Sequence, residues 1–248
     1  MATKPQIVLV PGAWHTPEAF SDIKGKLESH GYTIHARQLP SVGSNPPPED
    51  LSQDITALRA LITEAIGEGN EVLVVPHSWS GLITGSALSG YGIDKRAENG
   101  EKGGIRRLAF MCAFVVPEGV ALLDTIQGKI PDWWEVRDGL TFVKDQTIFY
   151  NDLPAPEQKK WFDLLQSHAF ATKKSKSTAA AWTEYPCSYL ICENDLAIPS
   201  FAQEGMVGGM KEMGVDVQVQ RMKSGHSPFL SRPDEVVEWI RRAAGEEI

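Results

Sequence analysis

A serine follows directly on an apolar run in residues 74–81 (VVPHSWSG), and a helical pattern follows the serine. Such a strand-to-helix turn exposes a serine hydroxyl beyond the end of the strand, where it can act as a nucleophile. The turn is tight, so the positions two residues before and after the serine are normally glycine. Here they are Pro76, which is bulkier and lacks an N–H group, and Ser80, which is small. Ser78 is the candidate nucleophile; Ser80 is a weaker one, and simple capping of the helix by Ser78 is the alternative.

A serine hydroxyl becomes a strong nucleophile only when a neighbouring imidazole removes its proton. In sites built on this turn, the acid and then the histidine follow the nucleophile along the chain. His168 and His226 are the histidines far downstream of Ser78. His226 lies on a turn just after the last apolar run, whereas His168 belongs to a helical pattern and is expected to pack or to face solvent. His226 is therefore the candidate base.

Polar residues follow another apolar run in residues 190–199 (LICENDLAIP). A carboxylate at the end of this strand can accept a hydrogen bond from the second ring nitrogen of His226 and stabilise the imidazolium ion. We expect Asp195 to take this role, with Glu193 as its rival. The alternative for Glu193 is a solvated loop carboxylate or a charge at the start of a helix.

Backbone N–H groups near Gly12 and at Trp79 could stabilise negative charge on a carbonyl oxygen. Gly12 follows the first apolar run, in residues 10–15 (VPGAWH), and lets the backbone turn so that an N–H group points toward the serine. The N–H group that follows a serine on such a turn is the usual second donor. One donor is worth about 3–4 kcal/mol in the transition state. His15 could contact a substrate or pack in its loop, whereas His77 is expected to be structural.

The elements that must position these residues alternate between apolar strand runs and helical patterns. The strand runs cover residues 6–10, 32–36, 71–75, part of 105–116, 188–192 and 216–222, and the helical patterns cover 17–30, 51–66, 79–89, 201–213 and 234–243. Alternation of this kind predicts an α/β fold with parallel strands, right-handed crossovers and helices on both faces of one sheet. The carboxyl ends of such strands meet at one edge, where ligands bind.

Residues 117–184 break this alternation and are rich in aromatic side chains. They contain one strong helical pattern, residues 156–168, and are too long for an ordinary connection. We expect a mostly helical lid over the carboxyl ends of the strands. Aromatic side chains would then form an apolar pocket, whose candidate lining residues are Trp14, His15, Phe114, Trp133, Trp134, Phe149 and Phe229. The basic run at residues 173–176 (KKSK) is expected to be a solvated turn.

Taken in order, the segments PGAWH, PHSWSG, CENDLAIP and SGHSPFL resemble the α/β-hydrolase superfamily. They are most similar to a branch of short enzymes that includes plant methylesterases, hydroxynitrile lyases and their fungal and bacterial relatives. The resemblance covers almost the whole chain and is weakest in the lid. It implies a six-stranded parallel sheet of order 2-1-3-4-5-6, a core of residues 1–116 and 185–248, and a lid of residues 117–184 between strands four and five.

The same resemblance places Ser78, Asp195 and His226 at the positions of a catalytic triad. It places the backbone N–H groups of Ala13 and Trp79 at the positions of the oxyanion hole. The expected activity is hydrolysis of small apolar carboxylic esters or lactones through an acyl-enzyme, with neither a metal nor a cofactor. The alternatives are lyase or carbon–carbon bond chemistry on the same triad, and a receptor that binds its ligand with little turnover.

Two positions favour hydrolysis over cyanohydrin cleavage. In the hydroxynitrile lyases that the chain resembles, a lysine directly follows the catalytic histidine and a threonine lies at the end of the first strand. The corresponding residues here are Ser227 and Gly12, which supply neither a positive charge nor the threonine hydroxyl. A lid lysine such as Lys129 or Lys144 could supply the charge instead.

Composition narrows the remaining classes of function. The net charge of −8 over 248 residues argues against nucleic acid or an anionic membrane as a partner. No apolar run reaches the roughly 18 residues needed to cross a bilayer, and we expect no signal peptide in the segment that begins at residues 1–5. Cys112, Cys187 and Cys192 lack metal-ligand spacing and are expected to be buried thiols in a reducing compartment. We expect a cytoplasmic enzyme for a small molecule, either a monomer or a homo-oligomer.

Overall fold

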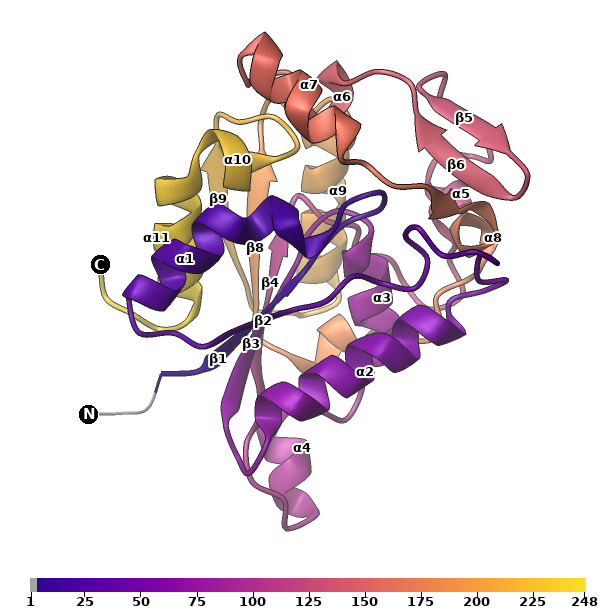
Figure 1. Ribbon diagram of the computed structural model, residues 1–248. Helices are drawn as coiled ribbons and strands as arrows, with labels where there is room; N and C mark the ends of the chain where they lie inside the picture. Colours follow the sequence, from indigo (N-terminus) through magenta and orange to yellow (C-terminus); the bar gives the residue numbers. More distant parts are fainter. Residues whose placement is uncertain (1–3) are drawn as a thin grey trace.

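Six strands form one parallel sheet in the computed structural model, which describes residues 4–248 (Figure 1). In spatial order they are β2 (Ile34–Ala36), β1 (Gln6–Val10), β3 (Glu71–Pro76), β4 (Gly104–Met111), β8 (Cys187–Cys192) and β9 (Val217–Met222). All neighbouring pairs are parallel, which confirms the predicted order 2-1-3-4-5-6. Residues 1–3, part of the segment in which no signal peptide is expected, lie outside the described residues.

Helices cover both faces of this sheet (Figure 1). One face carries α1 (Ser21–Ser29) and α11 (Pro233–Ala243), and the other carries α2 (Ser52–Ile66), α3 (Ser80–Ala87) and α9 (Ser200–Glu212). Side chains alternate across a strand, so Ile7 and Leu9 of β1 join the apolar cluster of α1, whereas Val8 and Val10 join that of α2. Burial on both faces explains why the central strands read as continuous apolar runs.

Three short helices refine the sequence prediction. The helical pattern at residues 17–30 divides into the 3₁₀ helix η1 (Pro17–Phe20) and α1. A helix α10 (Pro228–Ser231) precedes α11, and α4 (Ile93–Glu98) precedes the loop before β4. No side chain of α4 is buried, so its sequence lacks the apolar stripe by which a helix can be predicted. No described helix is long and apolar enough to cross a membrane.

The segment of residues 117–184 contains helices and also a small antiparallel sheet. Its helices are α5 (Leu122–Thr125), α6 (Thr147–Tyr150), α7 (Ala155–Asp163), α8 (Phe170–Lys174) and the 3₁₀ helix η2 (Ala181–Glu184), and its strands are β5 (Trp134–Arg137), β6 (Leu140–Val143) and β7 (His168–Ala169). The three strands pair in the order β5-β6-β7. The predicted helix of residues 156–168 ends at Asp163, and His168 begins β7 instead.

A local signal for this small sheet was present in the sequence. Asp138 and Gly139 separate β5 from β6 and have φ angles of 52° and 75°. An Asp-Gly pair favours the two-residue hairpin turn in which both residues have positive φ. The prediction of a mostly helical segment missed this hairpin because each of its strands has only four residues, too few for a clear alternation.

Candidate active site

Ser78 lies on a strained turn between β3 and α3. Its φ angle is 55°, in the left-handed region that a serine adopts at a cost of about 1–3 kcal/mol. At Gly81, helix α3 packs closely against the segment after β4, because an added Cβ would lie 2.3 Å from the carbonyl oxygen of Phe114. Pro76 ends β3 opposite Val10, so the departure from glycine at this position leaves the turn intact.

Ser80, the weaker candidate nucleophile, supports the turn. Its hydroxyl is fully buried, lies 2.8 Å from the carbonyl oxygen of Val10 and 2.9 Å from that of His77, and accepts a hydrogen bond from the His77 N–H group at 3.0 Å. These bonds fix the end of β1 beside the turn that carries Ser78. The hydroxyl of Ser80 therefore points into the protein.

The side chains of Ser78, His226 and Asp195 form one hydrogen-bonded chain. Ser78 Oγ donates to His226 Nε2 at 2.9 Å, and His226 Nδ1 donates to Asp195 Oδ2 at 2.7 Å. Asp195 follows β8, and His226 lies on the loop after β9, so three strands of the sheet deliver the three groups to one edge. A chain of this geometry can move a proton from the serine hydroxyl to the imidazole.

Four donors hold the carboxylate of Asp195. The backbone N–H groups of Ala197 and Ile198 each donate to Oδ1 at 2.8 Å, and Gln203 and His226 donate to Oδ2. The rival Glu193 points elsewhere, because its carboxylate accepts a hydrogen bond from Arg221 at 3.0 Å on the surface.

Residues 151 and 152 support the loops of the acid and the histidine. The N–H group of Gly225 donates to Asp152 Oδ2 at 2.7 Å, and Asn151 Nδ2 donates to the carbonyl oxygen of Asn194 at 3.0 Å. An added Cβ at Gly225 would lie 2.2 Å from Asn151 Oδ1, so only glycine fits there without movement. The roles of Asn151 and Asp152 could not be predicted from the sequence, because they depend on contacts between distant segments.

The end of β1 lies directly beside Ser78. An added Cβ at Gly12 would lie 2.9 Å from Ser78 Cβ, so a larger residue would displace the serine. Within residues 4–248, the backbone N–H groups of Ala13 and Trp79 donate no hydrogen bond. Trp14 has a φ angle of 64°, and its indole N–H group donates to the carbonyl oxygen of Thr141 at 3.0 Å. This anchor holds the loop that carries Ala13 against β6.

A cavity of about 50 Å³ opens at Ser78. Its lining includes five of the predicted pocket residues, namely Trp14, Phe114, Trp133, Trp134 and Phe149, together with Ala13 and Trp79. A larger apolar hollow of about 410 Å³ shares four lining residues with it, Phe114, Ile126, Ala197 and Ile198, and extends along α9. The shared residues place an apolar space of substrate size next to the cavity at Ser78.

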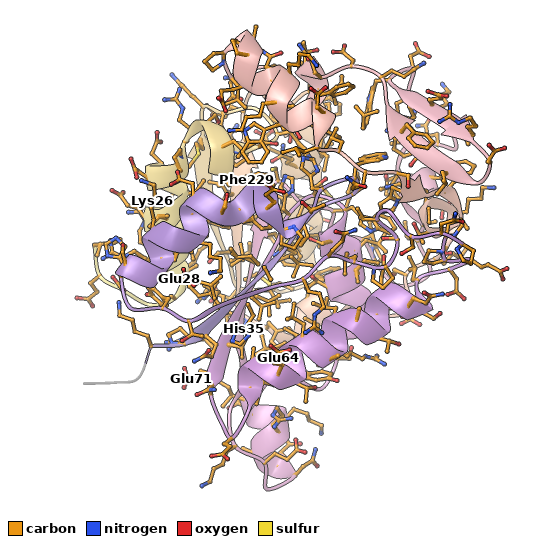
Figure 2. The ribbon with its side chains drawn as sticks, viewed as in Figure 1. Lys26, Glu28, His35, Glu64, Glu71 and Phe229 are labelled. Atoms are coloured by element: carbon orange, nitrogen blue, oxygen red, sulfur yellow. The ribbon has the colours of Figure 1, made fainter. Side chains whose placement is uncertain are left out.

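Two of the predicted pocket residues, His15 and Phe229, lie outside this cavity. His15 donates from Nδ1 to the carbonyl oxygen of Ala13 at 2.8 Å and accepts from the Tyr150 hydroxyl at Nε2 at 3.0 Å, so both ring nitrogens are occupied. Phe229 packs against the rings of Phe20 and His77, with centroids 4.8 and 4.9 Å away, on the α1 side of the sheet (Figure 2). The side chains of His15 and Phe229 therefore pack inside the protein and do not line the cavity.

Lys173 overturns the prediction that residues 173–176 form a solvated turn. Only 1% of this residue is exposed, and its side chain lines the cavity at Ser78. Lys174 and Lys176 are exposed, as predicted. Lys129 and Lys144, which sequence analysis offered as possible sources of positive charge, are also exposed. The lysine that reaches the cavity is therefore one that the sequence assigned to the surface.

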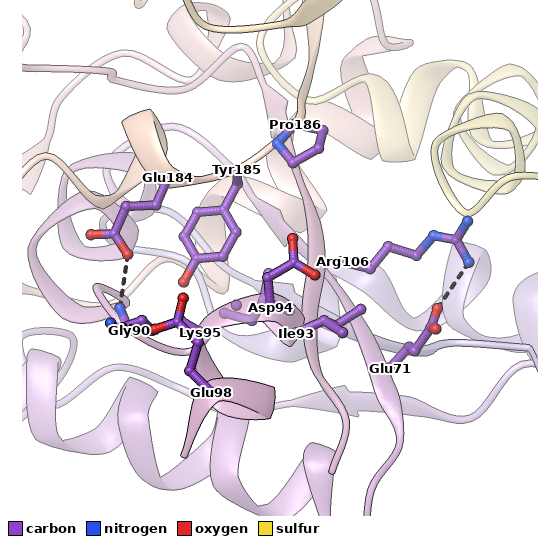
Figure 3. Close-up of a pocket in the computed structure, with 12 residues that line it drawn as sticks. Glu71, Gly90, Ile93, Asp94, Lys95, Glu98, Arg106, Glu184, Tyr185 and Pro186 are labelled. Atoms are coloured by element: carbon purple, nitrogen blue, oxygen red, sulfur yellow. Dashed lines mark hydrogen bonds and ion pairs between the residues drawn. The ribbon is translucent and has the colours of Figure 1, made fainter. Parts of the chain in front are cut away.

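A hollow of about 750 Å³, whose lining residues are drawn in Figure 3, lies at the amino-terminal ends of β3 and β4. Charged side chains of both signs line it, including Glu71 and Arg106, which form an ion pair at 2.9 Å. Its lining contains none of the candidate catalytic residues. Size alone therefore does not mark the candidate site in this protein.

The three cysteines are buried free thiols, as predicted. Sγ of Cys112 lies within 4.8 Å of ring nitrogens of His77 and His226, a spacing that could hold a metal ion. However, both ring nitrogens of His226 are bonded to Ser78 and Asp195, and His77 Nε2 donates to the carbonyl oxygen of His226 at 2.8 Å. The ring nitrogens of His226 are therefore already used, so the arrangement fits support of His226 by hydrogen bonds better than metal binding.

Three buried histidines should make the fold sensitive to acid. Burial lowers the pKa of His15 to about 4 and lowers the pKa values of His77 and His168 well below the ordinary value. The unfolded chain takes up these protons near pH 6.5 but the folded chain does not, so stability falls as the pH falls from about 6.5 toward 4. Each histidine contributes about 1.4 kcal/mol per pH unit in this window.

Urea unfolding at pH 7, 6 and 5 measures this effect, and we expect the midpoint to drop at each step. His168→Gln should make the drop shallower by about one proton, whereas His30→Gln should not, because His30 is exposed. A midpoint that stays constant from pH 7 to pH 5 would show that these histidines are not held neutral.

Comparison with known proteins places this chain in one family. The alpha/beta hydrolase family model matches residues 7–239. The alpha/beta hydrolase nvfD of Aspergillus novofumigatus is 36% identical over 252 residues, which cover 99% of this chain and 98% of that protein. The chain therefore belongs to the α/β-hydrolase family and is a hydrolase by class.

Solved structures agree on the fold. The pyrethroid hydrolase PytH is similar with a TM-score of 0.76 and 18% sequence identity, over 97% of both chains. Polyneuridine aldehyde esterase is similar with a TM-score of 0.74 and 17% identity, over 97% of this chain and 99% of that one. The α/β-hydrolase fold thus extends over nearly the whole chain, including the segment of residues 117–184.

Proposed function

We propose that this protein is a serine hydrolase of small carboxylic esters or lactones and that Ser78 is its nucleophile. The observation that carries the proposal is the hydrogen-bonded chain from Ser78 through His226 to Asp195, with bond lengths of 2.9 and 2.7 Å. Two structurally similar proteins, a pyrethroid hydrolase and an esterase by name, agree with ester hydrolysis on this fold.

The reaction uses side chains and backbone groups of this chain alone. His226 Nε2 accepts the hydroxyl proton as Ser78 Oγ attacks the carbonyl carbon. The N–H groups of Ala13 and Trp79, which have no other acceptor among the described residues, donate to the oxyanion. His226 then returns the proton to the leaving alkoxide, so an alcohol departs and an acyl-enzyme forms. Water, deprotonated by His226, releases the carboxylic acid and restores Ser78.

The segment of residues 117–184 acts as the lid of this site. Trp133, Trp134 and Phe149 of this segment line the cavity at Ser78. The adjoining hollow of about 410 Å³ is mainly apolar and would receive the larger apolar part of the ester. Exclusion of water by these aromatic side chains strengthens the hydrogen bonds to the oxyanion.

Cyanohydrin cleavage is the second candidate, because Lys173 brings an amine that can carry positive charge into the cavity. Hydrolysis remains the better match, since Ser227 is a neutral, buried neighbour of His226 and Gly12 has no hydroxyl. Departure of cyanide would depend on Lys173 alone for positive charge, whereas acyl transfer needs only the histidine and the oxyanion donors.

We expect one preparation to hydrolyse simple aryl or alkyl esters and to release no cyanide from mandelonitrile. Alcohol should appear in an initial burst if the acyl-enzyme accumulates, and the acid should follow at the steady rate. Parallel assays of ester products and of cyanide measure both activities. Release of aldehyde and cyanide that depends on Ser78, without ester turnover, would overturn the proposal in favour of a lyase.

A further inference from the structure

Lys173, in the five-residue helix α8, is buried among tryptophan rings. Its Nζ lies 4.3 Å from the ring centroid of Trp14, 4.5 Å from that of Trp79 and 5.3 Å from that of Trp134. Aromatic faces attract a cation at these distances, and the attraction is larger when the cation is removed from water. The side chain thus has a cage that stabilises an ammonium group and holds it in one place.

Protein groups leave this amine without a direct partner. Among residues 4–248, the contacts of Lys173 Nζ are with aromatic rings rather than with a hydrogen-bond or ion-pair partner. The charge that favours the ammonium form is that of Asp54 in α2. Its Oδ1 accepts a hydrogen bond from the Ser41 N–H group at 2.8 Å, and its buried Oδ2 has no hydrogen-bond partner among the described residues. The remaining titratable neighbour is His168, whose Nε2 has no hydrogen-bond partner.

Burial lowers the pKa of Lys173 well below its ordinary value, and the charge of Asp54 opposes this shift. A buried amine without a hydrogen-bond partner is costly, because water no longer solvates it. An anionic oxygen placed beside Nζ would remove this cost and would favour the ammonium form.

Lys173 and Ser78 line the same cavity, whose volume is only about 50 Å³. The other lining residues are uncharged, so Lys173 is the single ionisable amine or acid among the residues that line it. A substrate whose carbonyl carbon reaches Ser78 would therefore have only a few atoms between that carbon and the group that meets Lys173.

We propose that Lys173 binds a second, anionic oxygen of the substrate, so that the preferred substrates are esters or lactones carrying a carboxylate close to the scissile carbonyl. This inference rests on the proposed ester hydrolysis at Ser78. It adds a charged recognition element to a pocket that is otherwise apolar. Charge-assisted hydrogen bonds of this kind typically change affinity by about ten- to a hundredfold.

The test compares esters that differ by one group. Monomethyl malonate, succinate and glutarate are paired with methyl propanoate, butanoate and pentanoate, in which a methyl group replaces the carboxylate. Acid release in a pH-stat gives kcat/KM for each ester, and the ratio of carboxylate ester to neutral ester measures recognition of the anion. We expect the wild-type ratio to exceed one for at least one chain length.

Lys173→Met keeps the length of the side chain and removes the charge, and it should lower that ratio by about ten- to a hundredfold. Lys174→Met is the matched control, because Lys174 is the exposed neighbour whose Nζ lies over Phe170, and its ratio should equal that of wild type. An unchanged ratio in Lys173→Met, or an equal loss for both ester series, would overturn the inference and indicate a structural role.

The wild-type ratios of kcat/KM test the inference even if Lys173→Met fails to fold. Ratios below one at every chain length would overturn the role of Lys173 while leaving ester hydrolysis at Ser78 in place. Absence of turnover in both series, for wild type as for Ser78→Ala, would overturn the proposed hydrolysis and this inference with it.

Discussion

Replacing Asp195 by asparagine is expected to lower kcat by about four orders of magnitude, the loss caused by the equivalent change in a serine protease triad. The carboxylate accepts the Nδ1–H of His226 at 2.7 Å. An amide at this position can turn its NH₂ group toward Nδ1, which would force the proton onto Nε2. His226 could then no longer accept the proton of Ser78, although the shape of the site would be nearly unchanged.

Glu193→Gln is the matched control for this prediction. Glu193 lies two residues from Asp195 but pairs with Arg221 on the surface, so its neutralisation should leave ester turnover near that of wild type. Steady-state kinetics with one ester compare the activities of the two variants, and thermal unfolding checks that both are folded. A crippled Glu193→Gln beside a nearly normal Asp195→Asn would mean that the wrong carboxylate has been assigned.

Ser78→Ala is expected to lower kcat by about a millionfold, as loss of the nucleophile does in a serine protease. The change removes the atom that would form the acyl-enzyme but leaves the N–H groups of Ala13 and Trp79 in place. Residual hydrolysis should therefore remain above the rate in water. Fold stability should change little or rise, because an alanine at a φ of 55° is strained but the serine it replaces is strained as well.

Ser80→Ala separates this effect from damage to the turn. Ser80 donates to backbone carbonyl oxygens beside Ser78, so its loss should destabilise the protein. Molecules that fold should still turn over ester, because the hydroxyl of Ser80 points away from the cavity. Values of kcat normalised to the folded fraction distinguish Ser78→Ala from Ser80→Ala. Equal losses of kcat in the two variants would indicate that activity depends on the shape of the turn rather than on the Ser78 hydroxyl.

The sheet and the positions of the three candidate catalytic residues could be predicted because local patterns specify them. Parallel strands bring their carboxyl ends to one edge, so a serine, an acid and a histidine that each follow an apolar run must meet there. Ser78, Asp195 and His226 satisfy this rule, and their side chains are in contact. The choice of Asp195 over Glu193 also agrees with the side-chain contacts. Asp195 lies three residues past the end of β8, where the loop has turned toward His226.

The lining of the cavity could not be predicted in the same way. Lys173 belongs to a basic run that is typical of a surface, and its burial depends on Trp14 and Trp79, which are distant in sequence. Phe229 and His15 have suitable chemistry for a pocket, yet packing against other residues directs them elsewhere. Gln203 illustrates a third case, because its contact with Asp195 arises only when α9 packs beside the loop after β8.

Covalent labelling tests whether Ser78 is the nucleophile. A fluorophosphonate reacts with a serine hydroxyl that a histidine has activated and leaves a stable phosphonyl adduct. Treatment of the purified protein, followed by peptide mass spectrometry, should find one adduct per chain, on Ser78, and no adduct in Ser78→Ala or after prior unfolding. An adduct on Ser80, labelling that persists in Ser78→Ala, or a folded protein that takes up no label would contradict the assignment of Ser78 as the nucleophile.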